Sequence, residues 1–98
     1  NAVLSGNTIE GNSYSIVRLQ GIQSKCVGNS LKNNNESGIT IRMYGKRHII
    51  EQNSCNAKIN LQVDNYNIIK DNIALVDNTA QYSTTNIISD NVSPDAGD

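Results

Sequence analysis

One short segment holds most of the side chains that could do chemistry. It reads Arg42-Met43-Tyr44-Gly45-Lys46-Arg47-His48 and is the only basic cluster in the chain. An arginine can bind a carboxylate through two parallel hydrogen bonds, and it is also a candidate base for β-elimination. The flat ring of Tyr44 can stack on a sugar. His48 stands alone, and we interpret it as a turn residue rather than a catalyst.

The acidic residues do not form a second cluster. Asp64, Asp71 and Asp77 are spread over more than one repeat of the chain, so no calcium-binding group of carboxylates is predicted. Glycoside hydrolysis needs two facing carboxylic acids, and Asp64 is the only acid that we expect on the same sheet face as Arg42. We therefore expect no catalytic carboxylate pair.

Metal and redox chemistry are not indicated either. Cys26 and Cys55 have neither the spacing of metal ligands nor that of a disulfide framework. We interpret both as small buried hydrophobic residues. The sequence thus predicts no metal site and no cofactor.

An internal repeat defines the elements that would position these side chains. Blocks of the form apolar, spacer, asparagine, apolar recur at Asn7, Asn29, Asn53, Asn72 and Asn91, in steps of 22, 24, 19 and 19 residues. This period suits one turn of a solenoid. Asn tolerates the left-handed backbone of a tight bend, and amides stacked about 4.8 Å apart can hydrogen-bond to one another. We predict an asparagine ladder, with the alternative that asparagine is merely frequent in this chain.

A second type of segment lies between these blocks and alternates apolar with polar residues, as a half-buried strand does. The clear examples are 38–43 and 59–64, and weaker ones are 15–20 and 79–83. The alternation turns one set of side chains outward on a shared sheet: Arg18, Gln20, Thr40, Arg42, Tyr44, Asn60, Gln62, Asp64 and Gln81. From this set we take as candidate glycan-binding residues Arg18, Arg42, Tyr44, Gln62 and Asp64. The alternative is an ordinary solvated face, because outward strand residues are usually polar.

Composition supports an all-β chain. Sixteen Asn and thirteen Ile among 98 residues disfavour long helices and favour strands and turns. We predict a right-handed parallel β-helix of about four to five short coils over residues 1–92, followed by a polar exit segment at 93–98. The chain lacks the regularly spaced leucines of a leucine-rich repeat. An immunoglobulin-like sandwich would not repeat an asparagine at one bend. The net charge of −1 offers no reason to expect nucleic acid, and no apolar run is long enough to insert into a membrane.

The repeat resembles that of the pectate-lyase-like superfamily of right-handed parallel β-helices. The resemblance rests on His48-Ile49-Ile50-Glu51-Gln52-Asn53, on Asn67-Ile68-Ile69-Lys70-Asp71-Asn72 and on Gly38-Ile39-Thr40-Ile41. That group includes polysaccharide lyases, polygalacturonases, alginate epimerases and bacteriophage tailspikes, and its catalytic domains have many more coils. The resemblance therefore implies a segment of a longer β-helix, or one of several identical subunits such as a homotrimer.

The resemblance also implies a function. We expect an extracellular or virion-associated segment that engages a polysaccharide or cell-surface glycan, acting as scaffold and glycan-binding face. One alternative is a purely structural spacer or adhesin-like stalk. Another is a uronate polysaccharide lyase, although the epimerase-type Asp-Pro-His-Glu motif is absent.

Overall fold

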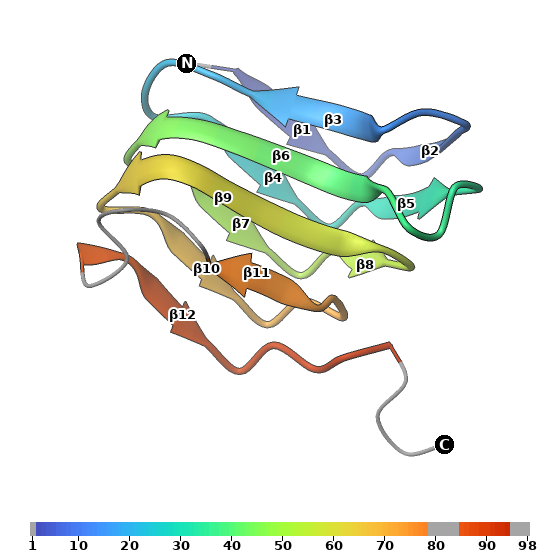
Figure 1. The fold of residues 1–98 in the computed structure, drawn as a ribbon. Coiled ribbons are helices and arrows are strands. Elements are labelled where there is room, and N and C mark those ends of the chain that lie inside the picture. The colour runs from blue at the N-terminus through green and yellow to red at the C-terminus, as the bar shows by residue number, and fades with distance from the viewer. Residues whose placement is uncertain (1, 79–84, 95–98) are drawn as a thin grey trace.

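The computed structural model describes residues 2–78 and 85–94 and shows a parallel β-solenoid (Figure 1). Each turn of the chain contributes one strand to each of up to three sheets, which we name A, B and C. Sheet A has the strand order β1 (Val3–Ser5), β4 (Lys25–Val27), β7 (Ile49–Glu51), β10 (Ile68–Lys70), β12 (Ile87–Ser89). All its strand pairs are parallel. The predicted all-β parallel β-helix architecture is confirmed.

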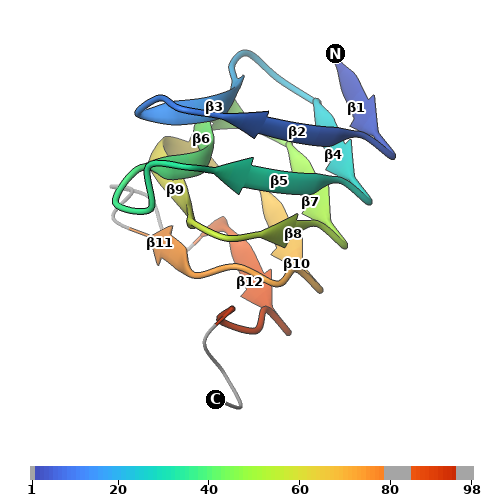
Figure 2. The ribbon, with the colours of Figure 1, turned by 90° about the vertical axis from the view of Figure 1, so that its right-hand side faces the viewer.

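The two other sheets complete the coil. Sheet B has the order β2 (Thr8–Gly11), β5 (Ser30–Asn33), β8 (Ser54–Cys55). Sheet C has the order β11 (Val76–Asn78), β9 (Lys58–Asn65), β6 (Ile39–Lys46), β3 (Ser15–Leu19). Figure 2 shows equivalent strands of successive turns lying one above another. Three of the alternating segments therefore form strands of sheet C, whereas the fourth, 79–83, falls outside the described residues. Within residues 2–78 and 85–94, no helix is long and apolar enough to cross a membrane.

The core is a column of inward side chains between the three sheets. It contains Val17, Leu19, Cys26, Leu31, Ile41, Met43, Ile50, Cys55, Ile59, Leu61, Ile69 and Ala74. Each fully buried large aliphatic side chain contributes about 1.5–3 kcal/mol relative to an exposed one. Cys26 and Cys55 are buried and free, so they act as small hydrophobic residues of this column.

The five repeating asparagines form a hydrogen-bonded ladder at the bend between sheets A and B. The backbone N–H groups of Asn7, Asn29, Asn53 and Asn72 donate to Oδ1 of the next asparagine over 2.9, 3.0, 2.9 and 3.1 Å. Their side-chain amides donate to the same oxygens over 3.3, 3.0, 3.0 and 2.9 Å, and Asn91 ends the series. The amides of the three interior members also donate to a backbone carbonyl of the preceding coil, over 3.0, 2.8 and 3.1 Å. The ladder thus satisfies polar groups that the bend would otherwise bury unpaired.

The asparagines do not themselves adopt the left-handed conformation, so that part of our prediction is wrong. The residue before each of them does, with φ values of 67, 69, 58, 58 and 59° at Gly6, Gly28, Gln52, Asp71 and Asp90. The left-handed residue turns the chain, and the asparagine that follows points inward. Asn therefore serves at this bend as a hydrogen-bonding group and not as the turn-former.

A second polar ladder, which we did not predict, lies at the bend between sheets C and A. The backbone N–H of Ser24 donates to Nδ1 of His48 (3.1 Å), and the N–H of His48 donates to Oδ1 of Asn67 (2.8 Å). The N–H and amide of Asn67 donate to Oδ1 of Asn86 over 2.9 and 3.1 Å. Because its members Ser24, His48 and Asn67 differ in type, and only Asn86 repeats a letter, this ladder leaves no regular pattern in the sequence.

Candidate functional site

The outer face of sheet C carries a row of polar side chains. Arg18 of β3 is in register with Arg42 of β6, Arg42 with Asn60 of β9, and Asn60 with Asp77 of β11. Because neighbouring strands lie about 4.8 Å apart, four polar residues from four successive coils follow one another at that spacing along the solenoid. The alternation of the strands positions the first three of them, since the neighbours of Arg18, Arg42 and Asn60 in sequence point into the core.

An arginine and tyrosine cluster occupies one end of this row. The guanidinium carbon of Arg18 lies 4.8 Å from the centre of the Tyr44 ring, and that of Arg42 lies 5.6 Å from the same ring. Arg42 also lies 5.2 Å from the ring of Tyr14, and its Nε donates to the Tyr44 hydroxyl over 2.6 Å. With its amide oxygen turned toward Arg18, Gln20 accepts from that guanidinium over 3.1 and 3.2 Å. The planar groups are therefore held in place before any ligand arrives.

The two guanidinium groups of this cluster have no described carboxylate partner. Among the described side chains the single ion pair joins Lys58 to Asp77, at the other end of the row. Arg18 and Arg42 sit on adjacent strands, so two like charges face the solvent side by side. Such a pair attracts an anion, and guanidinium groups bind carboxylates with bidentate geometry.

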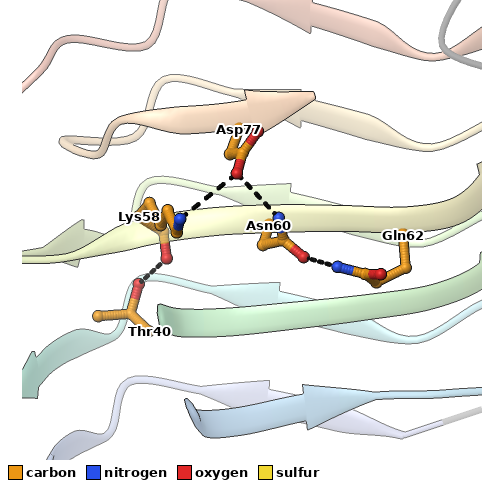
Figure 3. Close-up of polar contacts among 5 residues, drawn as sticks. All are labelled: Thr40, Lys58, Asn60, Gln62 and Asp77. Atoms are coloured by element: carbon orange, nitrogen blue, oxygen red, sulfur yellow. Dashed lines mark hydrogen bonds and ion pairs between the residues drawn. The ribbon is translucent and has the colours of Figure 1, made fainter. Parts of the chain in front are cut away.

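The opposite end of the row is a polar network around Asp77 (Figure 3). Its Oδ2 lies 3.5 Å from Nζ of Lys58 and accepts from Nδ2 of Asn60 over 3.1 Å. Nε2 of Gln62 in turn donates to Oδ1 of Asn60. These bonds orient the amides along the sheet and offset the negative charge of Asp77 with a neighbouring ammonium group.

The structure brings together three of the five candidate residues, Arg18, Arg42 and Tyr44. Gln62 lies on the same face, where its amide donates to Oδ1 of Asn60. Asp64 lies in β9 with its backbone in register with Gly45, and its side chain is outside the described ones.

Three further expectations about the outer face of sheet C, which concern Thr40, Asp64 and Gln81, have different outcomes. Thr40 does not point outward, because the register with β9 shifts between Ile39 and Ile41; its side chain is buried and its hydroxyl donates to the carbonyls of Ala57 and Lys58 over 2.9 and 3.1 Å. Asp64 is not the only acid in sheet C, since Asp77 lies on the outer face. Gln81 falls outside the described residues.

Tyr14 is a site residue that sequence reasoning missed. It precedes β3, is 62% exposed, and stacks on Arg42 of the next coil. The alternation of a strand assigns faces only within the strand, so it has no bearing on Tyr14. The one sequence feature that could have indicated Tyr14 is its position, as an aromatic residue just before the strand that bears Arg18.

His48 lies at the bend between β6 and β7, and its side chain is buried. Its ring is fully buried, Nδ1 accepts from the Ser24 N–H, and Nε2 lies 2.8 Å from the carbonyl oxygen of Tyr44. A carbonyl can only accept, so Nε2 donates to it, while Nδ1 accepts from the backbone. His48 therefore ties the end of β6, and with it the Tyr44 backbone, to the second ladder.

The described side chains of this face are suited to recognition of a ligand. Two fixed cations, two aromatic rings and several amides can bind a carboxylate-bearing sugar. Within the part of the chain that the structure describes, no group of three His, Cys, Asp or Glu could hold a metal ion. Asp77 is the one acid described on the face, whereas hydrolysis requires two.

Comparison with protein-family models, with curated proteins and with solved structures finds no match to this chain.

Proposed function

We propose that the outer face of sheet C binds an acidic polysaccharide. The observation that carries the proposal is the pair of stacked guanidinium groups, Arg18 and Arg42, held against the Tyr44 ring with no described carboxylate beside them. Each would take the carboxylate of a uronic acid, while Tyr44 and Tyr14 offer rings for stacking.

The spacing of the row favours a polymer over a single sugar. Adjacent strands are about 4.8 Å apart, which is close to the length of one sugar unit along a polysaccharide. A chain lying along the solenoid would follow the row from Arg18 and Arg42 past Asn60 to Asp77. The arginine end suits carboxylates and the amide of Gln62 suits hydroxyl groups, whereas Asn60 is only 5% exposed and holds Gln62 and Asp77 in place.

The resemblance to pectate-lyase-like β-helices supports the same proposal and extends it to the setting. The segment would belong to an extracellular or virion-associated protein, stacked on further coils or beside identical subunits. A rigid spacer without a ligand is the rival. The two continuous polar ladders favour rigidity, but they do not explain why two cations and two rings gather on one face.

Binding is tested by calorimetric titration with a galacturonate oligosaccharide and with a neutral galactose oligosaccharide of the same length. We expect affinity for the acidic oligosaccharide alone, decreasing as salt screens the charges. The double change Arg42→Ala and Tyr44→Ala should weaken it by about tenfold or more, since a charge-assisted hydrogen bond contributes about 1.5–3 kcal/mol. The matched control is Lys32→Ala, which removes one exposed positive charge from sheet B.

Two results would count against the proposal: equal binding of the neutral oligosaccharide, or full affinity in the double variant. Because arginine can also act as the base in β-elimination, absorbance of unsaturated uronate is recorded in the same mixtures. An increase that depends on Arg42 would replace binding by lyase activity.

A further inference from the structure

A concave site lies away from the outer face of sheet C, at the bend where the chain passes from sheet C to sheet A. We name this hollow the bend groove. Its volume is about 320 Å³, and it is lined by Gln23, Lys25, Arg47, His48, Ile49, Tyr66 and Ile68. Ligand-binding cavities span roughly 300–1,000 Å³, so the groove is of the size that holds one small molecule.

The geometry of the coil explains why the surface is hollow here. In three successive coils a left-handed residue is followed by a buried ladder residue and then by an outward residue of sheet A. The left-handed residues Gln23, Arg47 and Tyr66 form one wall, and the sheet A residues Lys25, Ile49 and Ile68 form the other. The buried ladder lies between them as a floor. The groove thus follows from the fold, and its chemistry depends on which side chains stand on its walls.

Those side chains form a cationic end and an apolar end. Lys25 and Arg47 line the groove, and no described carboxylate lies within ion-pair distance of either. The Arg47 guanidinium carbon lies 5.9 Å from the centre of the Tyr66 ring, which is 59% exposed. Ile49 and Ile68 line the same groove. An anion with an apolar face would satisfy both ends.

The backbone conformation of the bend positions two of these side chains. Arg47 and Tyr66 hold φ values of 62 and 57°, a region that a bulky side chain rarely adopts. The bend between sheets A and B uses glycine at two of its five left-handed positions, Gly6 and Gly28, so glycine suits such bends. The other three positions of that bend hold non-glycine residues, so a side chain is tolerated there as well. At the bend groove the same backbone conformation fixes where the side chains of Arg47 and Tyr66 leave the chain.

We propose that the bend groove binds a single hexuronate residue, with its carboxylate at Lys25 and Arg47 and its ring against Tyr66, Ile49 and Ile68. The amide of Gln23 at the rim suits the sugar hydroxyls. The ligand can come as the free sugar or as the end residue of an acidic polysaccharide. This site shares no residue with the arginine and tyrosine cluster of sheet C. The proposal is therefore independent of the function proposed above.

The test is a titration of the isotope-labelled protein with galacturonate, followed by the amide resonances of Gln23, Lys25 and Ile49. We expect saturable shifts with a dissociation constant of about 1 mM, because one small sugar offers few contacts. Galactose of the same ring size, benzoate and inorganic phosphate serve as comparison ligands. Shifts of equal size with galactose, or saturation with benzoate or phosphate but not with galacturonate, would overturn the proposal.

The decisive variant is Arg47→Gly, because glycine relieves the left-handed strain while it removes the cation. We expect galacturonate affinity to fall about tenfold or more, with a thermal midpoint no lower than that of the parent. Gln52→Gly is the matched control, since Gln52 has a φ of 58° at the other bend; it should keep the affinity. Unchanged affinity in Arg47→Gly would refute the site.

Two further measurements show whether the ligand is a free sugar or a chain end, and distinguish the bend groove from the face of sheet C. Equal affinity for galacturonate and for a galacturonate trisaccharide supports binding of a chain end, and binding of the monomer alone supports binding of the free sugar. The variant Arg42→Ala with Tyr44→Ala should keep the Gln23 and Lys25 shifts. Loss of those shifts in this variant would show that they report on sheet C, which would overturn the assignment to the groove.

Discussion

The asparagine ladder makes a quantitative prediction at Asn53, its middle member. The side chain is 1% exposed. Its Oδ1 accepts from the backbone N–H and the amide of Asn29, both over 3.0 Å. Its Nδ2 donates to the carbonyl of Cys26 over 2.8 Å and to Oδ1 of Asn72 over 3.0 Å. Replacement by alanine removes these four bonds at once, together with a weaker one that Oδ1 accepts from the Cys26 thiol over 3.7 Å.

The partners lose these bonds to different degrees. The amide of Asn29 still donates to the carbonyl of Leu4, and Oδ1 of Asn72 still accepts from the Asn53 backbone. The Asn29 N–H is left with no described acceptor, and a buried unpaired group costs about 1–3 kcal/mol. Adding the bond lost by the Cys26 carbonyl, we expect Asn53→Ala to lower the free energy of unfolding by about 2–4 kcal/mol. That is a large part of the roughly 5–15 kcal/mol that stabilises a domain.

The measurement is urea unfolding followed by circular dichroism, with Asn7→Ala as the control. Asn7 is exposed, and removing its amide leaves Oδ1 of Asn29 still bonded to the Asn7 N–H at 2.9 Å. We expect that control to cost about 0.5 kcal/mol or less, as for most surface changes. If Asn53→Ala costs no more than Asn7→Ala, the ladder is not a buried stabilising network and the reasoning fails.

Two other predictions concern a glycine and the thiols. Gly45 has a φ of 105°, and a Cβ there would lie 1.9 Å from the carbonyl oxygen of Gly21. Gly45→Ala should therefore lower the free energy of unfolding, measured in urea, by about 4 kcal/mol or more. A decrease below about 1 kcal/mol would contradict the close approach of these coils. Burial raises the pKa of Cys26 and of Cys55 to about 11, from a usual value of 9.0, and for Cys26 the neighbouring Cys55 adds to the effect. Iodoacetamide at pH 8 should therefore label these thiols slowly in the folded chain and rapidly in urea. Because the unfolded thiols lose their protons first, the free energy of unfolding should fall as the pH rises from about 9 to 11, by about 2 kcal/mol per thiol. Rapid labelling of the folded chain, or a rise in stability over that range, would contradict their burial.

Much of the architecture could be predicted from the sequence. The period, the inward aliphatic residues and the asparagine ladder come from patterns within one coil, and stacking repeats those patterns. Ile41 and Ile59, for example, face the core because alternation is a local property of a strand. The same rule placed Arg18, Arg42 and Tyr44 on one face.

Other features depended on the register between coils, which no local pattern encodes. The asparagine steps vary from 24 to 19 residues, so loops of different length precede strands that end side by side. A register shift in β6 turned Thr40 inward, and the position of β11 placed Asp77 beside Asn60. Such shifts override alternation because hydrogen bonds between strands, and not sequence spacing, set which residues face each other.

The sequence by itself thus determined that this chain is a parallel solenoid with a buried asparagine ladder, since both arise from a repeat that each coil carries. Only the tertiary structure decided that Tyr14 stacks on Arg42, that Ser24, His48 and Asn67 form a second ladder, and that the bend groove exists. Each of these joins residues about one coil apart in the chain. Their proximity follows from the stacking distance of about 4.8 Å between strands and from the bends that bring dissimilar residues into line.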